Sequence, residues 1–99
     1  MLAREWFARL EGLTRSQVKA WSYIVEYVKV HQRRCFTYND LTRFWPQAST
    51  RINVQTLDRR IREFVGEGLL ERFDKEWHGR RRAVFCLPED LFLFYTSGR

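Results

Sequence analysis

The chain has 99 residues, of which 44% are apolar and sixteen are aromatic, which predicts one domain with a core that needs no cross-links. No apolar run approaches the ~18 residues of a membrane helix. Residues 1–6 lack the pattern of a signal peptide, so we expect a cytoplasmic protein with no membrane partner. The net charge of +6, with fifteen arginines among eighteen basic residues, favours a polyanionic partner because guanidinium groups match phosphate and guanine.

The two cysteines, Cys35 and Cys86, lie in predicted strands and form no recognised metal motif. Two buried free thiols are the simplest interpretation, and a disulfide is the alternative if the two strands pair. A zinc site that adds His31 and His78 is disfavoured because the spacings match no standard site. We therefore expect no metal and no cofactor.

The first third of the chain predicts two helices. Residues 2–11 form a short amphipathic helix that ends at Gly12, with an apolar side made of Leu2, Trp6, Phe7 and Leu10. Thr14 and Gln17 have the spacing of a capping box, which opens a helix that continues to about His31. Its main apolar stripe is Trp21, Ile24, Val25 and Val28. A second stripe, expected to face the N-terminal helix or a second subunit, is Ala20, Tyr23, Tyr27 and Val30.

The middle of the chain predicts a short strand at 35–37 and then two helices. Thr37 or Asn39 caps the first helix, which carries Leu41, Phe44 and Trp45 and ends at Pro46. Asn53 caps the second helix, 54–67. Its buried side is Val54, Leu57, Ile61, Phe64 and Val65. Its outer side is Gln55, Thr56, Arg59, Arg62 and Glu63, with Arg60 on the flank.

The last third predicts two strands, 69–73 and 83–87, around a polar loop at 74–82 that bends near Gly79. Trp77 is the unusual residue of this loop, because it must fold back on the hairpin or pack on a partner. After Pro88, residues 89–95 fit either a helix or a strand. We favour a helix, since acidic residues follow a proline.

This order of elements over residues 14–87 resembles the winged helix-turn-helix family of DNA-binding domains. The specific part opens with a polar cap and a valine, Asn53-Val54-Gln55-Thr56-Leu57, and closes with Gly68-Leu69-Leu70. The resemblance implies an α+β fold: a three-helix core, a small antiparallel sheet forming one wing, and short helical extensions at 1–13 and 88–99. The linker 46–53 is longer than the turn of a minimal helix-turn-helix.

The resemblance implies that helix 54–67 enters the major groove and that wing 74–82 touches the flanking backbone or minor groove. Outward positions near the helix start predict base contacts from Gln55, Thr56 and Arg59. Backbone contacts are expected from Thr50, Arg51, Arg60 and Arg62. Wing contacts are expected from Lys75, His78, Arg80, Arg81 and Arg82, because adjacent like charges repel unless an anion lies nearby.

We expect a sequence-specific regulator of transcription that binds double-stranded DNA as a homodimer, similar to stand-alone regulators of archaea, their viruses and plasmids. The expected dimer interface is Trp6, Tyr23, Tyr27, Leu91, Phe92 and Tyr95. The alternative is a winged-helix module that docks on a protein of a replication or transcription complex. No residues suggest an enzyme or a small-molecule ligand.

Overall fold

The computed structural model describes residues 3–97, and within that range it has five α-helices, two single-turn 3-10 helices and three strands. In chain order these are α1 (Arg4–Glu11), α2 (Arg15–His31), β1 (Cys35–Phe36), α3 (Tyr38–Phe44), η1 (Trp45–Gln47), η2 (Val54–Thr56), α4 (Leu57–Gly66), β2 (Glu71–Trp77), β3 (Arg80–Cys86) and α5 (Glu89–Thr96). The α+β class and the order of elements are as predicted. Leu2 lies outside the described residues.

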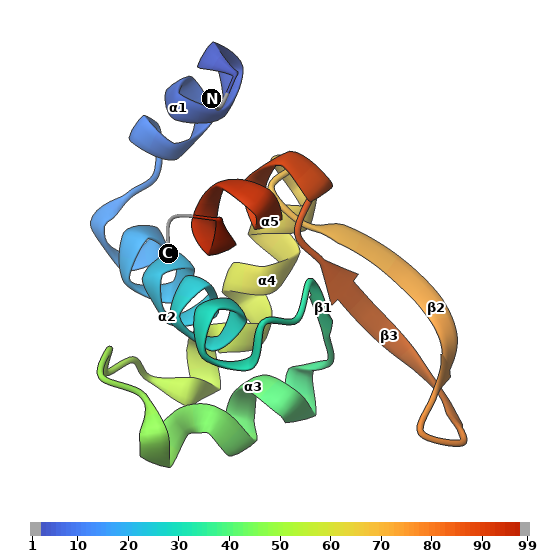
Figure 1. The fold of residues 1–99 in the computed structure, drawn as a ribbon. Coiled ribbons are helices and arrows are strands. Elements are labelled where there is room, and N and C mark those ends of the chain that lie inside the picture. The colour runs from blue at the N-terminus through green and yellow to red at the C-terminus, as the bar shows by residue number, and fades with distance from the viewer. Residues whose placement is uncertain (1–2, 98–99) are drawn as a thin grey trace.

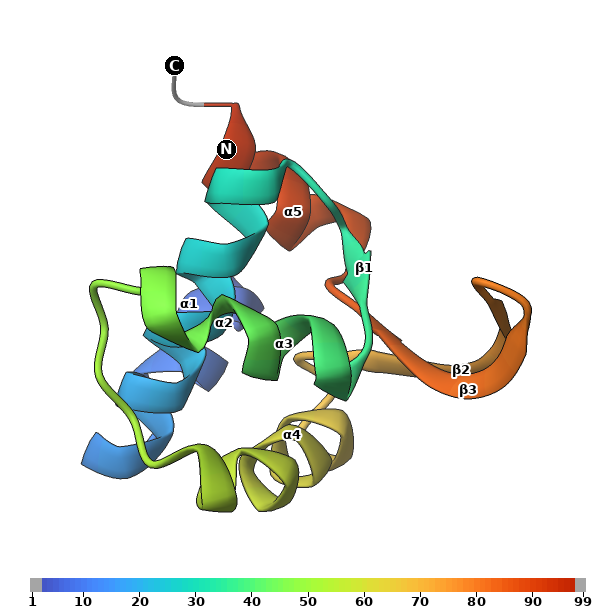
Figure 2. The same ribbon diagram turned by 90° about the horizontal axis from the view of Figure 1, so that it is seen from below.

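Helices α2, α3 and α4 pack around one core, and the hairpin β2–β3 extends away from the helices (Figures 1 and 2). Tyr23, Leu41 and Phe64, one from each helix, are fully buried there. Helix α5 lies against α2, where the indole N–H of Trp21 donates to the hydroxyl of Tyr95 at 3.0 Å. Helix α1 lies at the edge of this body (Figure 1) and contains no fully buried residue, although Trp6 and Leu10 pack against the core.

Capping groups fix the helix boundaries. The predicted box of Thr14 and Gln17 opens α2, and Thr37, rather than Asn39, opens α3 in a second box with Asp40. Asn53 accepts from the Gln55 amide at 2.9 Å, so the predicted helix 54–67 begins as η2 and continues as α4. Residue Trp45 belongs to the turn η1 and is 37% exposed, which corrects its expected place on the helix.

Gly68 ends α4 in a left-handed conformation, with φ at 76°. Its amide donates to the carbonyl of Val65 at 3.1 Å, and the next amide, of Leu69, donates to that of Phe64 at 2.9 Å. These are the two hydrogen bonds of a Schellman motif, which turns the chain sharply and which glycine adopts without a steric penalty. The motif directs the chain from α4 into the hairpin.

The sheet has the order β1-β3-β2, and its register places Cys35 directly opposite Cys86. The two residues form a disulfide between strands 51 positions apart in sequence. The expectation of two free thiols is therefore wrong, and the disulfide alternative holds because the strands pair. The side chain of Arg34 adds a hydrogen bond to the Leu87 carbonyl at 2.8 Å beside this junction.

The hairpin is longer and tighter than predicted. Strands expected at 69–73 and 83–87 run instead to Trp77 and from Arg80, so most of the expected loop 74–82 is paired strand. Only His78 and Gly79 form the turn, with φ at 52° and 82°. Two consecutive positive φ values define the two-residue turn whose twist matches a β-hairpin. The sequence did not predict the outer parts of these strands because both of their faces are exposed and carry polar residues.

The second stripe of α2 is not a spare surface. Tyr23 and Tyr27 are 0% and 3% exposed, and their rings pack edge-on against Phe44 at 5.7 Å and 5.5 Å. Helix α3 covers this side of α2, while Val30 at the end of the stripe is 59% exposed. Leu91 of α5 is fully buried as well. The expected places of Tyr23, Tyr27 and Leu91 in a dimer interface are therefore wrong. No helix among residues 3–97 has the length and apolarity to cross a membrane.

Candidate nucleic-acid interface

The outer face of α4 presents one arginine without a charge partner. Arg59 and Gln55 are exposed, and none of the ion pairs found within residues 3–97 involves Arg59. Arg62 is exposed too, but it pairs with Asp58 at 3.2 Å. Thr56 is half-buried, and its hydroxyl donates to the Asn53 carbonyl at 2.8 Å. Of the three expected base contacts, Gln55 and Arg59 have free side chains, whereas the Thr56 hydroxyl is occupied by the Asn53 carbonyl.

Glu63 of α4 is hydrogen-bonded both to Arg60 of its own helix and to Gln17 of α2. Arg60 donates to Glu63 at 2.8 Å, and the Gln17 side chain donates to the same carboxylate at 3.1 Å. The hydrogen bond from Arg60 lowers the pKa of Glu63, with a further contribution from Gln17. Glu63 therefore faces α2. The same pairing occupies Arg60, so its expected role as a backbone contact is not supported.

The segment before α4 is held by a carboxylate from α2. Glu26 accepts from the amides of Ser49 and Thr50 at 2.6 Å and 3.0 Å. Burial alone would raise the pKa of Glu26, but these amide hydrogen bonds outweigh it and lower the pKa. Arg51 lies over the ring of Trp45, 4.5 Å from its centroid, and donates to the Trp45 carbonyl at 3.0 Å. The long linker is thus ordered, and Arg51 is exposed but locally anchored.

Strand pairing divides the charges of the hairpin between two faces. Side chains alternate along each strand, and directly paired residues share a face. The first face, called here the aromatic–basic face, comprises Phe73, Lys75, Trp77, Arg80 and Arg82. The opposite face comprises Arg72, Asp74, Glu76 and Arg81. The three consecutive arginines are therefore not one cluster, which corrects the expectation of mutual repulsion.

The aromatic–basic face carries three cations and no acid along its outer half. The Lys75 ammonium lies 5.9 Å from the Phe73 ring centroid and 5.7 Å from that of Trp77, as the shared face requires. None of the ion pairs within residues 3–97 involves Lys75, Arg80 or Arg82. On the opposite face, Arg72 pairs with Asp74 at 3.3 Å, and Arg81 lies across from Glu76. Positive charge without compensation is thus confined to one face.

A small hollow lies at the tip of the hairpin. Its volume is about 250 Å³, and it is lined by Arg33, Glu76, Trp77 and His78. The rings of Trp77 and His78 meet nearly at right angles, with centroids 5.6 Å apart. The indole N–H of Trp77 is buried and has no hydrogen-bond partner. Arg33 belongs to the α2–β1 connection, so sequence proximity gave no signal that it lies beside the hairpin tip.

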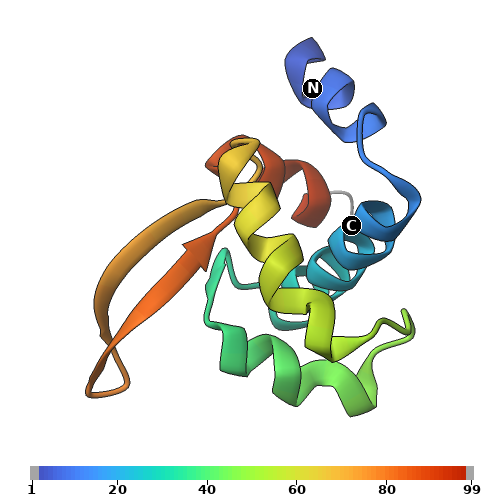
Figure 3. The ribbon, with the colours of Figure 1, turned by 180° about the vertical axis from the view of Figure 1, so that it is seen from behind.

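The N-terminal end of α4 and the tip of the hairpin lie toward the same end of the molecule, which is the end occupied by α3 (Figure 3). Arg59 lies in the first turn of α4, and Gln55 lies in η2, which leads into it. One elongated polyanion that reached this end could therefore approach both the outer face of α4 and the hairpin.

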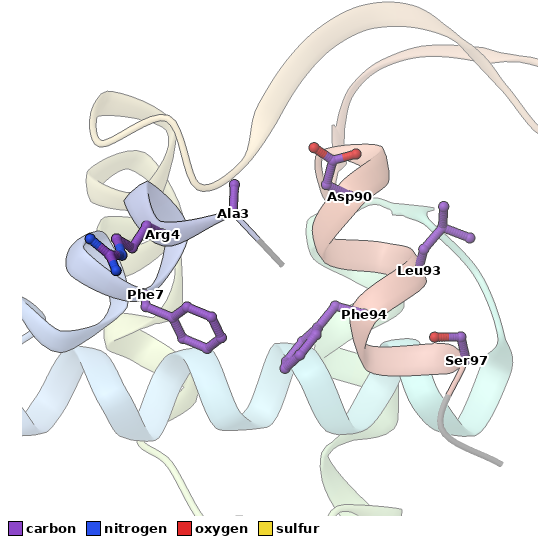
Figure 4. A pocket seen from close by; sticks show the side chains of 7 residues that line it. All are labelled: Ala3, Arg4, Phe7, Asp90, Leu93, Phe94 and Ser97. Atoms are coloured by element: carbon purple, nitrogen blue, oxygen red, sulfur yellow. The ribbon is translucent and has the colours of Figure 1, made fainter. Parts of the chain in front are cut away.

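A second surface is apolar and lies between the two terminal helices. A groove of about 890 Å³ is lined by Ala3, Arg4, Phe7, Asp90, Leu93, Phe94 and Ser97. Phe7 and Phe94 point toward one another across it (Figure 4), with ring centroids 6.0 Å apart, and they are 42% and 44% exposed. The sequence prediction named Phe92 and Tyr95 instead, because the helical phase of 89–95 was unknown.

Comparison with models of protein families, with curated proteins and with solved structures found no match to this chain.

Proposed function

We propose that this chain is a winged helix-turn-helix protein that binds double-stranded DNA sequence-specifically and regulates transcription. In this proposal α4 enters the major groove and the β2–β3 hairpin is the wing on the flanking backbone or minor groove. The observation that carries it is the placement of exposed basic residues on two segments. Arg59 lies in the first turn of α4 and the hairpin bears the aromatic–basic face, and the N-terminal end of α4 and the hairpin tip lie toward one end of the molecule (Figure 3). A helix fits the major groove, where base edges present a distinct pattern.

Contacts within the chain refine the role of each residue. Gln55 and Arg59 are the base-reading residues, because both are exposed at the start of the helix. Arg62 contacts the backbone by exchanging Asp58 for a phosphate, and Arg51 and Thr50 lie beside the same end of the helix. On the wing, Lys75, Arg80 and Arg82 bind phosphates from one face, and Arg81 contributes less because it faces Glu76.

The proposed assembly is a homodimer, with a second copy seated on the groove between α1 and α5. The groove exposes Phe7, Leu93 and Phe94, and one wall carries Arg4 while the other carries Asp90 (Figure 4). A two-fold axis would bring Arg4 of one copy toward Asp90 of the other, which makes the surface self-complementary in charge. Trp6, Phe92 and Tyr95, which were expected at the interface, are half-buried and pack against the core instead of lining the groove.

Selection from a pool of random duplexes tests sequence specificity. We expect one enriched motif, arranged as two half-sites about 34 Å apart on the DNA if the dimer is symmetric. Arg59→Ala should relax the preference at one position, where a bidentate contact to guanine discriminates by about 1–3 kcal/mol. Arg60→Ala is the matched control, because that arginine is held by Glu63 and should leave the motif unchanged. Enrichment of no motif would contradict sequence-specific binding.

The second candidate is a protein-docking module without specific DNA binding, and the exposed apolar groove is the observation that favours it. Salt separates the two functions, because phosphate contacts weaken steeply as salt rises and apolar docking does not. We assign no catalytic role to the chain. The proposed DNA-binding role places it in the cytoplasm, on the genome of a cell or of an infecting virus.

A further inference from the structure

Binding of duplex DNA alone does not account for some features of the hairpin tip. Phosphate binding needs cations, yet the face that carries Lys75, Arg80 and Arg82 also carries two aromatic rings, of Phe73 and Trp77. Phe73 is 44% exposed although it is a large apolar side chain. Alternation of aromatic and basic side chains along one face is the arrangement by which proteins bind single strands, with bases stacked on rings and phosphates on cations.

The hollow beside Trp77 has the size and the chemistry for one flat aromatic group. Its volume of about 250 Å³ is below the range of about 300–1,000 Å³ that drug-sized ligands occupy. Trp77 and His78 supply two ring walls, and Arg33 supplies a guanidinium that can stack on a base or bind its phosphate. Glu76 supplies the only carboxylate of the lining, which can accept a hydrogen bond from an exocyclic amine.

The indole N–H of Trp77 is the second observation. It is buried and has no hydrogen-bond partner among the described residues, a condition that costs free energy and that a shift of the indole toward an acceptor on a ligand would relieve. Base acceptors and phosphate oxygens both provide such a group. Trp45, by contrast, donates to the Ile52 carbonyl at 3.1 Å and is covered on one side by Arg51. The two tryptophans therefore differ in whether their polar group is satisfied.

We propose that the hollow formed by Arg33, Glu76, Trp77 and His78 binds one unpaired base of a DNA strand whose phosphates lie along Lys75, Arg80 and Arg82. The base stacks on the indole, and the ring shifts so that its N–H donates to an acceptor of the nucleotide. This inference deepens the proposed DNA-binding function: the preferred ligand is a duplex that continues into a single strand at the wing. Arg80 and Arg82 are two residues apart on β3, about 6.6 Å along the strand, and Lys75 lies directly opposite Arg82, so the cations occupy two successive positions along the face.

Fluorescence anisotropy with three DNA ligands tests the proposal. All share one duplex, which is blunt, or carries a short single-stranded overhang, or carries the same overhang with abasic sugars in place of nucleotides. The abasic overhang keeps the phosphates and removes the bases. We expect the wild type to bind the normal overhang about tenfold more tightly than the blunt duplex, in line with the stacking of one base, and to bind the abasic overhang with at most a small gain.

Variants of the two tryptophans assign the gain to the hollow. Trp77→Ala should lower the affinity for the normal overhang to that for the abasic overhang, while Trp77→Phe should keep part of the preference because the ring remains. Trp45→Phe is the matched control and should keep the full preference. Quenching of tryptophan fluorescence by the overhang should be present in the wild type and in Trp45→Phe, and largely absent from Trp77→Phe.

Several outcomes would overturn the inference. Equal affinity for blunt and overhang ligands, an equal gain from the abasic overhang, or a preference retained by Trp77→Ala would each exclude base binding in the hollow. If those results accompany salt-dependent binding of blunt duplex, the proposed function survives and only this inference fails. Absence of binding to every ligand at low salt would overturn both.

Discussion

The disulfide between Cys35 and Cys86 should supply a large share of the stability of this domain. The bridge closes a segment with a sequence separation of 51 residues that contains α3, α4 and β2. Restricting the unfolded chain over a loop of that length stabilises the folded state by about 4 kcal/mol at 25 °C. We expect reduction to lower the free energy of unfolding by about that amount, and the melting temperature by about 15–30 °C.

Urea unfolding with and without reductant, followed by tryptophan fluorescence, measures this effect. With a slope near 2 kcal/mol/M the midpoint should fall by about 2 M. The Cys35→Ala/Cys86→Ala variant should unfold at a low urea concentration and should not respond to reductant. The reduced chain should still fold in the absence of urea, because Leu87 and Arg34 join the same strands by backbone and side-chain hydrogen bonds of 3.0 Å and 2.8 Å.

A midpoint that does not change on reduction, while alkylation and mass spectrometry show both thiols released, would refute this reasoning. It would mean that the unfolded chain gains no freedom when the bridge opens. Intact mass after alkylation without reductant is the control, because it reports whether the purified chain carries the disulfide.

Three further predictions concern pH, the α4 terminus and assembly. The pKa values of Glu26 and Glu63 are lowered in the folded state, so the stability that these carboxylates contribute is present above the ordinary pKa of 4.5. This stability is lost as the pH falls through the folded pKa values. In urea titrations from pH 7 to 3, Glu26→Gln should reduce the loss of stability at low pH. Gly68→Ala should destabilise the domain by about 1 kcal/mol in the same assay, since φ is 76°, whereas Gly66→Ala, in open space on the helix, should not. Phe94→Glu should make the protein monomeric in light scattering if the groove joins two copies, and an unchanged mass would place any dimer elsewhere.

Local signals in the sequence predicted most of the helix boundaries. The capping box of Thr14 and Gln17, the cap at Asn53 and the glycine after α4 each act within a few residues, so their pattern predicts boundaries that the structure confirms. The α-helix at 89–96 also follows from its acidic first turn after a proline. These interactions depend little on the rest of the fold.

Features that depend on tertiary partners could not be predicted. Glu63 lies on the outer arc of its helix in a wheel diagram, but Gln17 and Arg60 turn it toward α2. The sequence shows Tyr23 and Tyr27 as an apolar stripe but does not show what covers it. In the structure that partner is α3, through Phe44. The length of the hairpin was concealed because neither face of its outer half is buried, and the pattern of alternating apolar residues was absent.

Salt titration of DNA binding by two hairpin variants tests the central claim most directly. Lys75→Ala/Arg80→Ala/Arg82→Ala removes the unpaired cations of the aromatic–basic face, and Arg72→Ala/Arg81→Ala removes arginines from the opposite face. We predict that wild-type affinity for duplex DNA falls steeply with salt. The triple variant should bind more weakly, and its salt slope should be smaller by about 2.7, because each phosphate that a protein neutralises adds ~0.9 to the slope. The double variant should change the affinity and the salt slope much less than the triple variant does. Equal slopes for all three proteins, or a wild type that does not bind at low salt, would contradict the hairpin as a DNA-binding wing.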